Sequence, residues 1–133
     1  MEIGTTVSHM FRFEEDFSEW YALCQARGHP WTRLTAGWGR LLRSPTMFED
    51  VIKTICTTNT RWSGTKRMIA KLVTTLGDRY AEHSTLHAFP TPEAIARAQP
   101  AVFTTVIPLG YRAASIQQLA VSVATQNTFL VFQ

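Results

Sequence analysis

The chain has 133 residues, of which 45% are hydrophobic and 17% are charged, and its formal net charge is +3 at pH 7. This length is typical of one domain, and the high apolar content excludes the disordered class, in which few apolar residues accompany a high net charge. The sequence has no run of roughly 20 apolar residues for a membrane span and no signal-peptide core at its N-terminus. We therefore expect a folded cytoplasmic protein without a membrane segment.

The N-terminal third predicts one helix and one further helical turn. Residues 1–11 are weakly patterned, and we expect them to be frayed. Asp16, followed three residues later by Glu19, resembles a helix-start box, and the apolar stripe after it predicts a helix that ends near residues 28–30. Over residues 31–42, apolar side chains recur at roughly helical spacing but two glycines interrupt them. This pattern predicts a short helix and then an irregular, closely packed turn.

Residues 48–77 predict two amphipathic helices joined by a polar loop at residues 57–62. Each helix is indicated by apolar side chains at i, i+3, i+4, i+7 and i+8, or closely so, which lie on one helix face. Ser44-Pro45 is expected to begin the first helix, Ser63 to cap the second, and Gly77 to end it in a left-handed conformation. The two apolar series are Phe48, Val51, Ile52, Ile55 and Cys56, and then Met68, Ile69, Leu72, Val73 and Leu76.

The C-terminal part predicts a loop, a short helix and a longer helix. Residues 78–88 are polar with little period, as in a connecting loop. Thr91 followed by Pro92 is typical of a helix start. Leu109-Gly110 breaks the chain before a last helix, which is marked by the apolar residues Ala113, Ile116, Leu119, Ala120 and Val123. No stretch before residue 125 alternates for long enough to predict a strand, so the predicted fold class is all-α. Residues 125–133 form an anomalous tail that fits nothing before it.

Charge and ligand residues constrain the partner. Residues 34–80 hold eight Lys or Arg and three acids, which gives +5 there and −2 in the remainder. A basic middle suits a phosphate-bearing partner, although a solvated helix face is the plainer interpretation of the charge alone. Two cysteines without a CxxC spacing and four scattered histidines form no ligand pattern, so we expect no metal and no cofactor. Cys56 continues an apolar helix face and is expected in the core.

The order of four short motifs carries a resemblance to a known family. They are Gly39-Arg40-Leu41-Leu42-Arg43, Ile55-Cys56-Thr57-Thr58-Asn59, Phe89-Pro90-Thr91-Pro92-Glu93 and Gly110-Tyr111-Arg112-Ala113. Each motif alone is weak, but in this order the chain resembles the helix-hairpin-helix GPD superfamily of DNA glycosylases, most closely the branch that includes eight-oxoguanine DNA glycosylase. The resemblance implies a helical bundle like the first half of that fold, with residues 1–133 as one partial domain.

The resemblance also implies roles for three side chains at the site of a damaged base. Asn59 would enter the gap left when the nucleotide is turned out, Tyr111 would wedge between stacked bases, and Arg112 would donate hydrogen bonds to the widowed base. Filling the gap recovers part of the cost of extruding a base, a few kcal/mol. From the residues alone, Asn59 also fits a left-handed helix end, Tyr111 the edge of the core, and Arg112 a solvated surface.

Basic residues near the loop are candidates for phosphate contact. These are Arg61, Lys66 and Arg67. Trp62 lies beside them and is close enough in sequence to touch a base, but core packing is the preferred interpretation for this residue.

The family's catalytic elements are not identified in this sequence. Family members carry a glycine-rich hairpin after the last helix, a catalytic aspartate and, in one branch, a catalytic lysine. Here the last glycine is Gly110, the last lysine Lys71 and the last aspartate Asp78. We therefore predict no catalytic residue, and we expect a fragment, a truncated product or a remnant of a glycosylase. Uncovered apolar faces would favour self-association or a complementary chain.

Three functions follow from these observations. The first is a DNA glycosylase-like protein of base-excision repair that contacts double-stranded DNA containing a damaged base. The second is a non-catalytic helical DNA-binding module, and the third is a helical protein-interaction domain. Salt-dependent affinity for duplex DNA would favour the first two over the third.

Overall fold

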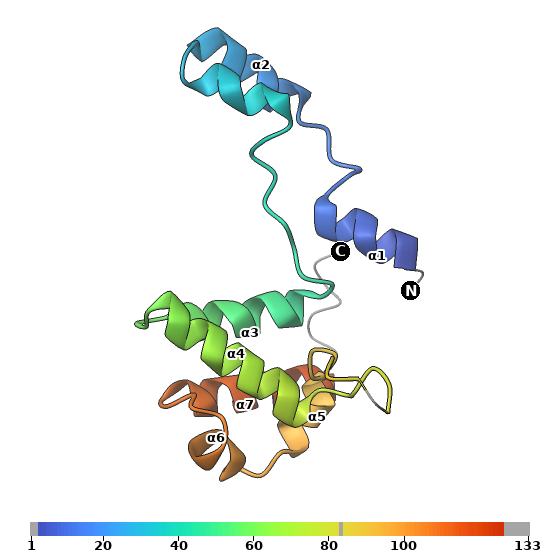
Figure 1. Ribbon diagram of the computed structural model, residues 1–133, viewed down its shortest axis with the longest axis vertical. Helices are drawn as coiled ribbons and strands as arrows, with labels where there is room; N and C mark the ends of the chain where they lie inside the picture. Colours follow the sequence, from blue (N-terminus) through green and yellow to red (C-terminus); the bar gives the residue numbers. More distant parts are fainter. Residues whose placement is uncertain (1–2, 83, 127–133) are drawn as a thin grey trace. The chain divides into compact units, whose positions relative to one another are not determined.

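A computed structural model describes residues 3–82 and 84–126, and the chain forms two compact units, Met1–Thr46 and Met47–Gln133 (Figure 1). Every regular element among the described residues is a helix, which confirms the all-α prediction, and an isolated antiparallel bridge pairs Arg79 with His87. The single-domain expectation stays a prediction, and each unit is described by itself. The helices are α1 (Ile3–Phe11), α2 (Ser18–Arg27), the 3-10 helix η1 (Trp31–Ala36), α3 (Met47–Thr57), α4 (Trp62–Leu76), α5 (Pro92–Arg97), α6 (Val102–Thr105) and α7 (Arg112–Gln126).

None of these helices is long and apolar enough to cross a membrane, over the part of the chain that the structure describes.

The start of unit 1 differs from the sequence expectation. Residues 1–11 were expected to be frayed, whereas Ile3–Phe11 form α1. The apolar side chains of Ile3, Val7, Met10 and Phe11 recur at helical spacing, and this short pattern favours the helix. α2 ends at Gly28, which has φ +72°, and this agrees with the predicted end near residues 28–30.

Asp16 organises the start of α2, but not through the predicted box with Glu19. Its Oδ1 accepts hydrogen bonds from the backbone N–H of Ser18 at 2.8 Å and from the Ser18 hydroxyl at 2.5 Å. These bonds stabilise the charged carboxylate and hold the pKa of Asp16 below its ordinary value. The residue before α2 is Phe17, which makes no side-chain cap.

Arginines join the segment after η1 to the turn after α1. Arg43 Nη2 lies 2.6 Å from Glu15 Oε1, and Arg40 donates to the backbone oxygens of Glu15 (3.3 Å) and Arg12. The hydrogen-bonded guanidinium of Arg12 is the main reason why the pKa of Glu15 is lowered. The two arginines of the first motif therefore link their segment to the turn after α1.

The segment that carries this motif is not the closely packed turn that the sequence predicted. Trp38, Leu41 and Leu42 are 62%, 77% and 67% exposed. Self-association through such apolar side chains stays a prediction.

Unit 2 has one core, to which all five of its helices contribute. The predicted apolar faces of α3, α4 and α7 are confirmed, because the residues on these faces are buried or half-buried. Cys56 is fully buried, as expected for a small core residue, and its burial raises the pKa of the thiol. The buried apolar residues are Phe48, Ile52, Cys56, Met68, Leu72, Ile95, Phe103, Ile107, Leu109, Ile116 and Ala120.

The helix starts of unit 2 agree with the sequence at one place and differ at two. Thr91 caps α5 as predicted, since its hydroxyl accepts from the Ala94 N–H at 3.2 Å and Pro92 is the first helical residue. Ser44-Pro45 does not begin α3, which starts at Met47. Ser63 is the second residue of α4 rather than its cap, and the cap residue Arg61 makes no side-chain bond to the helix.

Gly77 ends α4 for a different reason from the predicted one. Its backbone is extended, with φ −82° and ψ 143°, and not left-handed. A Cβ at this position would lie 2.0 Å from the Ala88 carbonyl oxygen and 2.7 Å from that of Val73. The loop at residues 78–88 folds back here, because the Ala88 N–H donates to the Asp78 oxygen at 2.8 Å. Gly77 is therefore required by the close approach of two backbone segments.

The last predicted helix is confirmed as α7, which includes Thr125 and Gln126 of the anomalous tail. The rest of that tail, residues 127–133, lies outside the described residues.

We predict that Gly77→Ala lowers the free energy of unfolding by about 1–3 kcal/mol, because the added methyl group would overlap the backbone oxygens of Ala88 and Val73. Urea denaturation followed by circular dichroism measures the change. Gly4→Ala is the control, since nothing lies within 4 Å of a Cβ there. Equal stability of the two variants would contradict the packing argument.

Candidate nucleic-acid interface

The loop between α3 and α4, residues 58–61, is held in one conformation by both helices. The Thr65 hydroxyl of α4 donates to the Cys56 carbonyl of α3 at 3.1 Å in the buried interior. The backbone N–H groups of Gly64 and Thr65 both donate to the Arg61 oxygen, at 2.8 and 3.1 Å. A Cβ on Gly64 would lie 2.5 Å from the Thr60 hydroxyl, so the loop packs closely on the first turn of α4.

Asn59 occupies the tip of this loop in a left-handed backbone conformation, with φ +41°. Non-glycine residues rarely adopt this region, and asparagine is among those that do so most readily. The residue is exposed. Thus the helix-end interpretation of Asn59 is correct for the backbone, and it leaves the side chain accessible for a contact.

The first residues of α7 meet the loop. Gly110, with φ +59°, turns the chain into the helix, and the following Tyr111 is 66% exposed. The Tyr111 hydroxyl lies 3.3 Å from the Thr58 hydroxyl, and the guanidinium carbon of Arg112 lies 4.5 Å from the Tyr111 ring centroid. The structure therefore brings together the three residues singled out by the motifs. Because Tyr111 is 66% exposed, its interpretation as a half-buried residue at the edge of the core is wrong.

Arg112 is buried, with 7% of its surface exposed, so the solvated interpretation of this residue is wrong. Its Nε donates to the Thr58 hydroxyl at 3.2 Å, and its Nη1 donates to the Leu109 carbonyl at 3.2 Å. Its Nη2 donates to the carbonyls of Thr58 and of Asn59, the latter at 3.4 Å. The guanidinium is thus directed at the protein. The predicted donation to a base stays a prediction.

Trp62 is the first residue of α4 and is 67% exposed, so the preferred core interpretation is wrong. The buried face of α4 begins one turn later, at Thr65, and Trp62 lies beyond the end of the core. The predicted phosphate contacts Arg61, Lys66 and Arg67 are all exposed on the loop and the first two turns of α4. An indole and three cations therefore adjoin Asn59 along the chain.

Sequence reasoning did not identify the groups that hold the site together. Thr58 contributes its hydroxyl and carbonyl to Arg112, and Leu109 contributes a carbonyl. Thr58 is part of a motif, but the sequence assigned it no role of its own. No sequence signal identifies a backbone oxygen as the acceptor of a hydrogen bond from a distant arginine.

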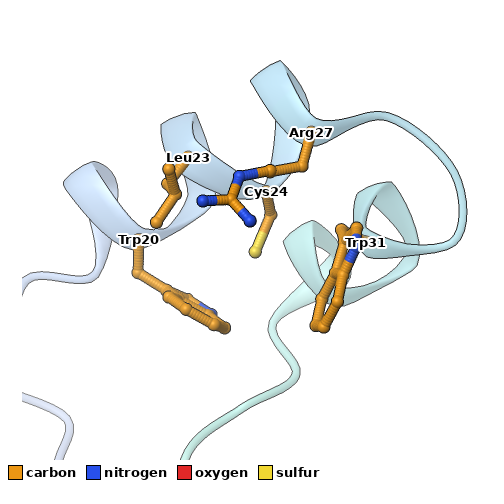
Figure 2. Close-up of a pocket in the computed structure, with 5 residues that line it drawn as sticks. All are labelled: Trp20, Leu23, Cys24, Arg27 and Trp31. Atoms are coloured by element: carbon orange, nitrogen blue, oxygen red, sulfur yellow. The ribbon is translucent and has the colours of Figure 1, made fainter.

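Unit 1 contains a separate hollow of about 170 Å³ between α2 and η1 (Figure 2). Trp20 and Trp31 flank the sulfur of Cys24, and the guanidinium of Arg27 lies beside it. The hollow is apolar and contains none of the predicted contact residues, so we assign it no role in the candidate interface.

Among residues 3–82 and 84–126, no three His, Cys, Asp or Glu side chains are grouped as ligands for a metal ion.

Comparison with known proteins relates this geometry to one family. Residues 52–131, more than half of the chain, match the family model described as HhH-GPD superfamily base excision DNA repair protein. The chain is also similar to the solved structure of MBOgg1 in complex with a low affinity DNA ligand, with a TM-score of 0.71 and 18% sequence identity. That match covers 96% of this chain and 45% of the other, so this chain spans less than half the length of that protein. The comparison with curated proteins finds no match.

We predict that Thr65→Val, which keeps the side-chain shape, lowers the free energy of unfolding by about 1–3 kcal/mol, because it leaves the buried Cys56 carbonyl without this donor. Thr74→Val on the same helix is the matched control, since the Thr74 hydroxyl donates to the Ala70 carbonyl at an exposed position. The control should change stability by no more than about 0.5 kcal/mol. Urea denaturation of both variants gives the two values, and equal values would contradict the proposed importance of this bond.

Proposed function

Because this chain belongs to the HhH-GPD superfamily of base excision DNA repair proteins, we propose that it binds double-stranded DNA at a damaged base, as part of a DNA glycosylase-like repair function. One observation carries the proposal. Asn59 and Tyr111 come from segments far apart in the chain, yet they are exposed at one end of unit 2 and joined there through Thr58 and Arg112. The proposed location of the protein is accordingly on DNA.

Asn59 and Tyr111 have the chemistry that an opened duplex requires. An enzyme that acts on a base must first extrude it from the stack, which costs a few kcal/mol. The amide of Asn59 offers two donors and an acceptor to the edge of the unpaired base. The phenol ring of Tyr111 offers a stacking face to the neighbouring bases. We propose that together they occupy the gap and offset part of the extrusion cost.

The DNA backbone would be bound beside the gap by the cations of the loop and α4. Arg61, Lys66 and Arg67 are exposed and follow Asn59 directly in the chain. Trp62 lies among them with 67% of its surface exposed, and an indole stacks on any base irrespective of sequence. We therefore propose phosphate contacts for the three cations and a stacking contact for Trp62.

We assign this interface a binding role rather than a catalytic one. Asn59, Tyr111 and Trp62 supply hydrogen bonds and ring faces, and none of them is poised as a nucleophile or general base. This observation favours a second candidate function, a non-catalytic DNA-binding module that retains the family's lesion contacts. Both candidates predict the same DNA contacts, whereas a protein-interaction domain predicts none of them.

We predict that Asn59→Gly and Tyr111→Ala each weaken binding to a duplex with one abasic-site analogue by about 10-fold, equivalent to about 1.4 kcal/mol. Binding to the intact duplex should change much less, because no gap is open there. Glycine adopts a φ of +41° without strain, so the Asn59 variant reports the missing amide. Fluorescence anisotropy with labelled duplexes measures both affinities.

Tyr80→Ala is the control for this experiment, since Tyr80 is 82% exposed and lies in the 78–88 loop. An effect of Tyr80→Ala as large as that of Tyr111→Ala, or equal affinity of the wild-type chain for both duplexes, would contradict the proposed gap contacts.

We predict that the combined variant Arg61→Gln, Lys66→Gln and Arg67→Gln reduces the salt dependence of duplex binding. The slope of log K against log salt is negative, and each lost phosphate contact lowers its magnitude by about 0.9, so the loss of three contacts should lower the magnitude by about 2.7. Titrations at several salt concentrations measure this slope.

Two further variants separate the possible causes. Trp62→Ala should reduce affinity without changing the slope, because stacking releases no counterions. Arg97→Gln should change neither, since α5 lies at the other end of unit 2 from the α3–α4 loop (Figure 1). A slope unchanged by the combined variant would exclude these three residues as phosphate contacts.

A further inference from the structure

We propose that unit 1 binds single-stranded DNA, with two successive bases held in two neighbouring hollows that share Trp31. This site is distinct from the duplex contacts proposed for unit 2, so that either can exist without the other. Three features of residues 18–39 support it, namely the placing of the tryptophans, the arginines beside them and the size of the hollows.

Three of the four tryptophans of the chain line the two hollows. Trp20 and Trp31 stand on either side of the hollow of about 170 Å³, with the sulfur of the buried Cys24 between them (Figure 2). Trp31 and Trp38 line a second hollow of about 300 Å³. Because Trp31 belongs to both hollows, they are neighbours. Such a series of rings offers stacking faces to successive unpaired bases.

The local structure holds the rings in place before any ligand binds. The Thr32 N–H donates to the Gly28 oxygen at 3.2 Å, which fixes the turn between α2 and η1 beside Trp31. The indole of Trp20 packs against the backbone at Gly39, where a Cβ would lie 3.1 Å from the indole Nε1. A site that is already formed avoids part of the entropy cost of ordering side chains on binding.

An arginine lines each hollow, Arg27 the first and Arg33 the second. Both are exposed, and their guanidinium groups make no hydrogen bond or ion pair with the residues that the structure describes. Arg40 and Arg43 differ, because they bind the Glu15 segment. A cation at each hollow matches the one phosphate that each nucleotide carries.

Size and charge favour a nucleotide over other occupants. Clefts for drug-sized ligands measure about 300–1,000 Å³, so each of these hollows suits a single flat group. Bases within a duplex are stacked on each other, so the strand that enters must be unpaired. From residue 18 to residue 38 the one acid is Glu19, and it lines neither hollow. A second copy of the chain at this face would therefore bring Arg27 and Arg33 of both copies together without acids to pair them.

Binding of a labelled oligothymidylate of about ten nucleotides to the full chain, followed by fluorescence anisotropy, tests the site. Trp20→Leu and Trp38→Leu should each lose about 10-fold in affinity, and Trp31→Leu about 100-fold because Trp31 serves both bases. Tyr80→Leu is the control, since it removes an exposed ring from unit 2 and should change nothing. Wild-type affinity of Trp31→Leu, or an equal loss in Tyr80→Leu, would overturn the inference.

A second substitution at Trp31 separates stacking from an effect on the fold. Trp31→Phe keeps an aromatic ring and should retain affinity within about 3-fold of the wild type, because phenylalanine also stacks on bases. Circular dichroism checks that both Trp31 variants keep the helical content of the wild type. A loss in Trp31→Phe as large as that in Trp31→Leu would show that the residue acts through the fold and would overturn the inference.

The arginines are tested through the salt dependence of oligothymidylate binding. For single strands each phosphate contact contributes about 0.7 to the magnitude of the slope of log K against log salt. The combined variant Arg27→Gln and Arg33→Gln should therefore lower this magnitude by about 1.4. An unchanged slope would exclude the two arginines as phosphate contacts and overturn the proposed site.

The same proteins distinguish failure of this inference from failure of the proposed function. Weak oligothymidylate binding in Trp31→Leu would support the unit 1 site even if the wild-type chain bound abasic and intact duplexes equally. Binding that is kept in Trp31→Leu and lost in the combined variant of Arg61, Lys66 and Arg67 would place the single strand on unit 2 and overturn the inference. Analytical ultracentrifugation tests the remaining occupant, because loss of a dimer in Trp31→Leu with wild-type oligothymidylate affinity would assign this face to a second copy.

Discussion

The candidate interface depends on one buried cation. Arg112 begins α7 and donates hydrogen bonds to the loop that joins α3 to α4, 54 positions earlier in the chain. Burying a guanidinium is unfavourable unless its donors are satisfied, so the loop carbonyls and the cation each require the other. Because Leu109 belongs to the same bond set, the turn before α7 is fixed together with the loop. Arg112 therefore links the segment of Asn59 to the segment of Tyr111, in addition to the contact between the Thr58 and Tyr111 hydroxyls.

The helices of unit 2 could be predicted from the sequence because their period reflects the core itself. Ile52, Leu72 and Ile116 are fully buried where the spacing placed them. Helix ends were predicted less well, since cap signals are local and the core decides where a helix begins. Trp62 shows the same limit, because its helical spacing continues the buried face of α4 past the point where the core ends. Gly77 was identified as a helix end, but its close approach to Ala88 depends on the fold of the loop that follows.

The candidate site was predictable in part, and only through the order of its motifs. That order singled out Asn59 and Tyr111, which the structure brings together at the surface, whereas charge and periodicity do not distinguish them from ordinary surface residues. The hydrogen-bond partners of Arg112 could not be predicted, because they are mainly backbone oxygens and every residue has one. Arg40 and Arg43 illustrate the same point in unit 1. They contribute to the basic middle of the sequence, yet they bind the Glu15 segment of their own unit.

Under the proposed function, a loop that is already fixed lets a small number of side chains contribute to DNA binding. Ordering a flexible segment at the moment of binding costs conformational entropy, and that cost reduces the affinity gained from each contact. At Asn59 the cost is met when the chain folds, because the Arg112 and Thr65 bonds set the loop before any DNA is present. Under the proposed function, the left-handed backbone of Asn59 serves DNA binding as well as ending the helix. If Asn59 adopted a right-handed or extended conformation, both flanking peptide planes would turn and their bonds to Arg112 would break, so the left-handed backbone of Asn59 and the burial of Arg112 are two aspects of one arrangement.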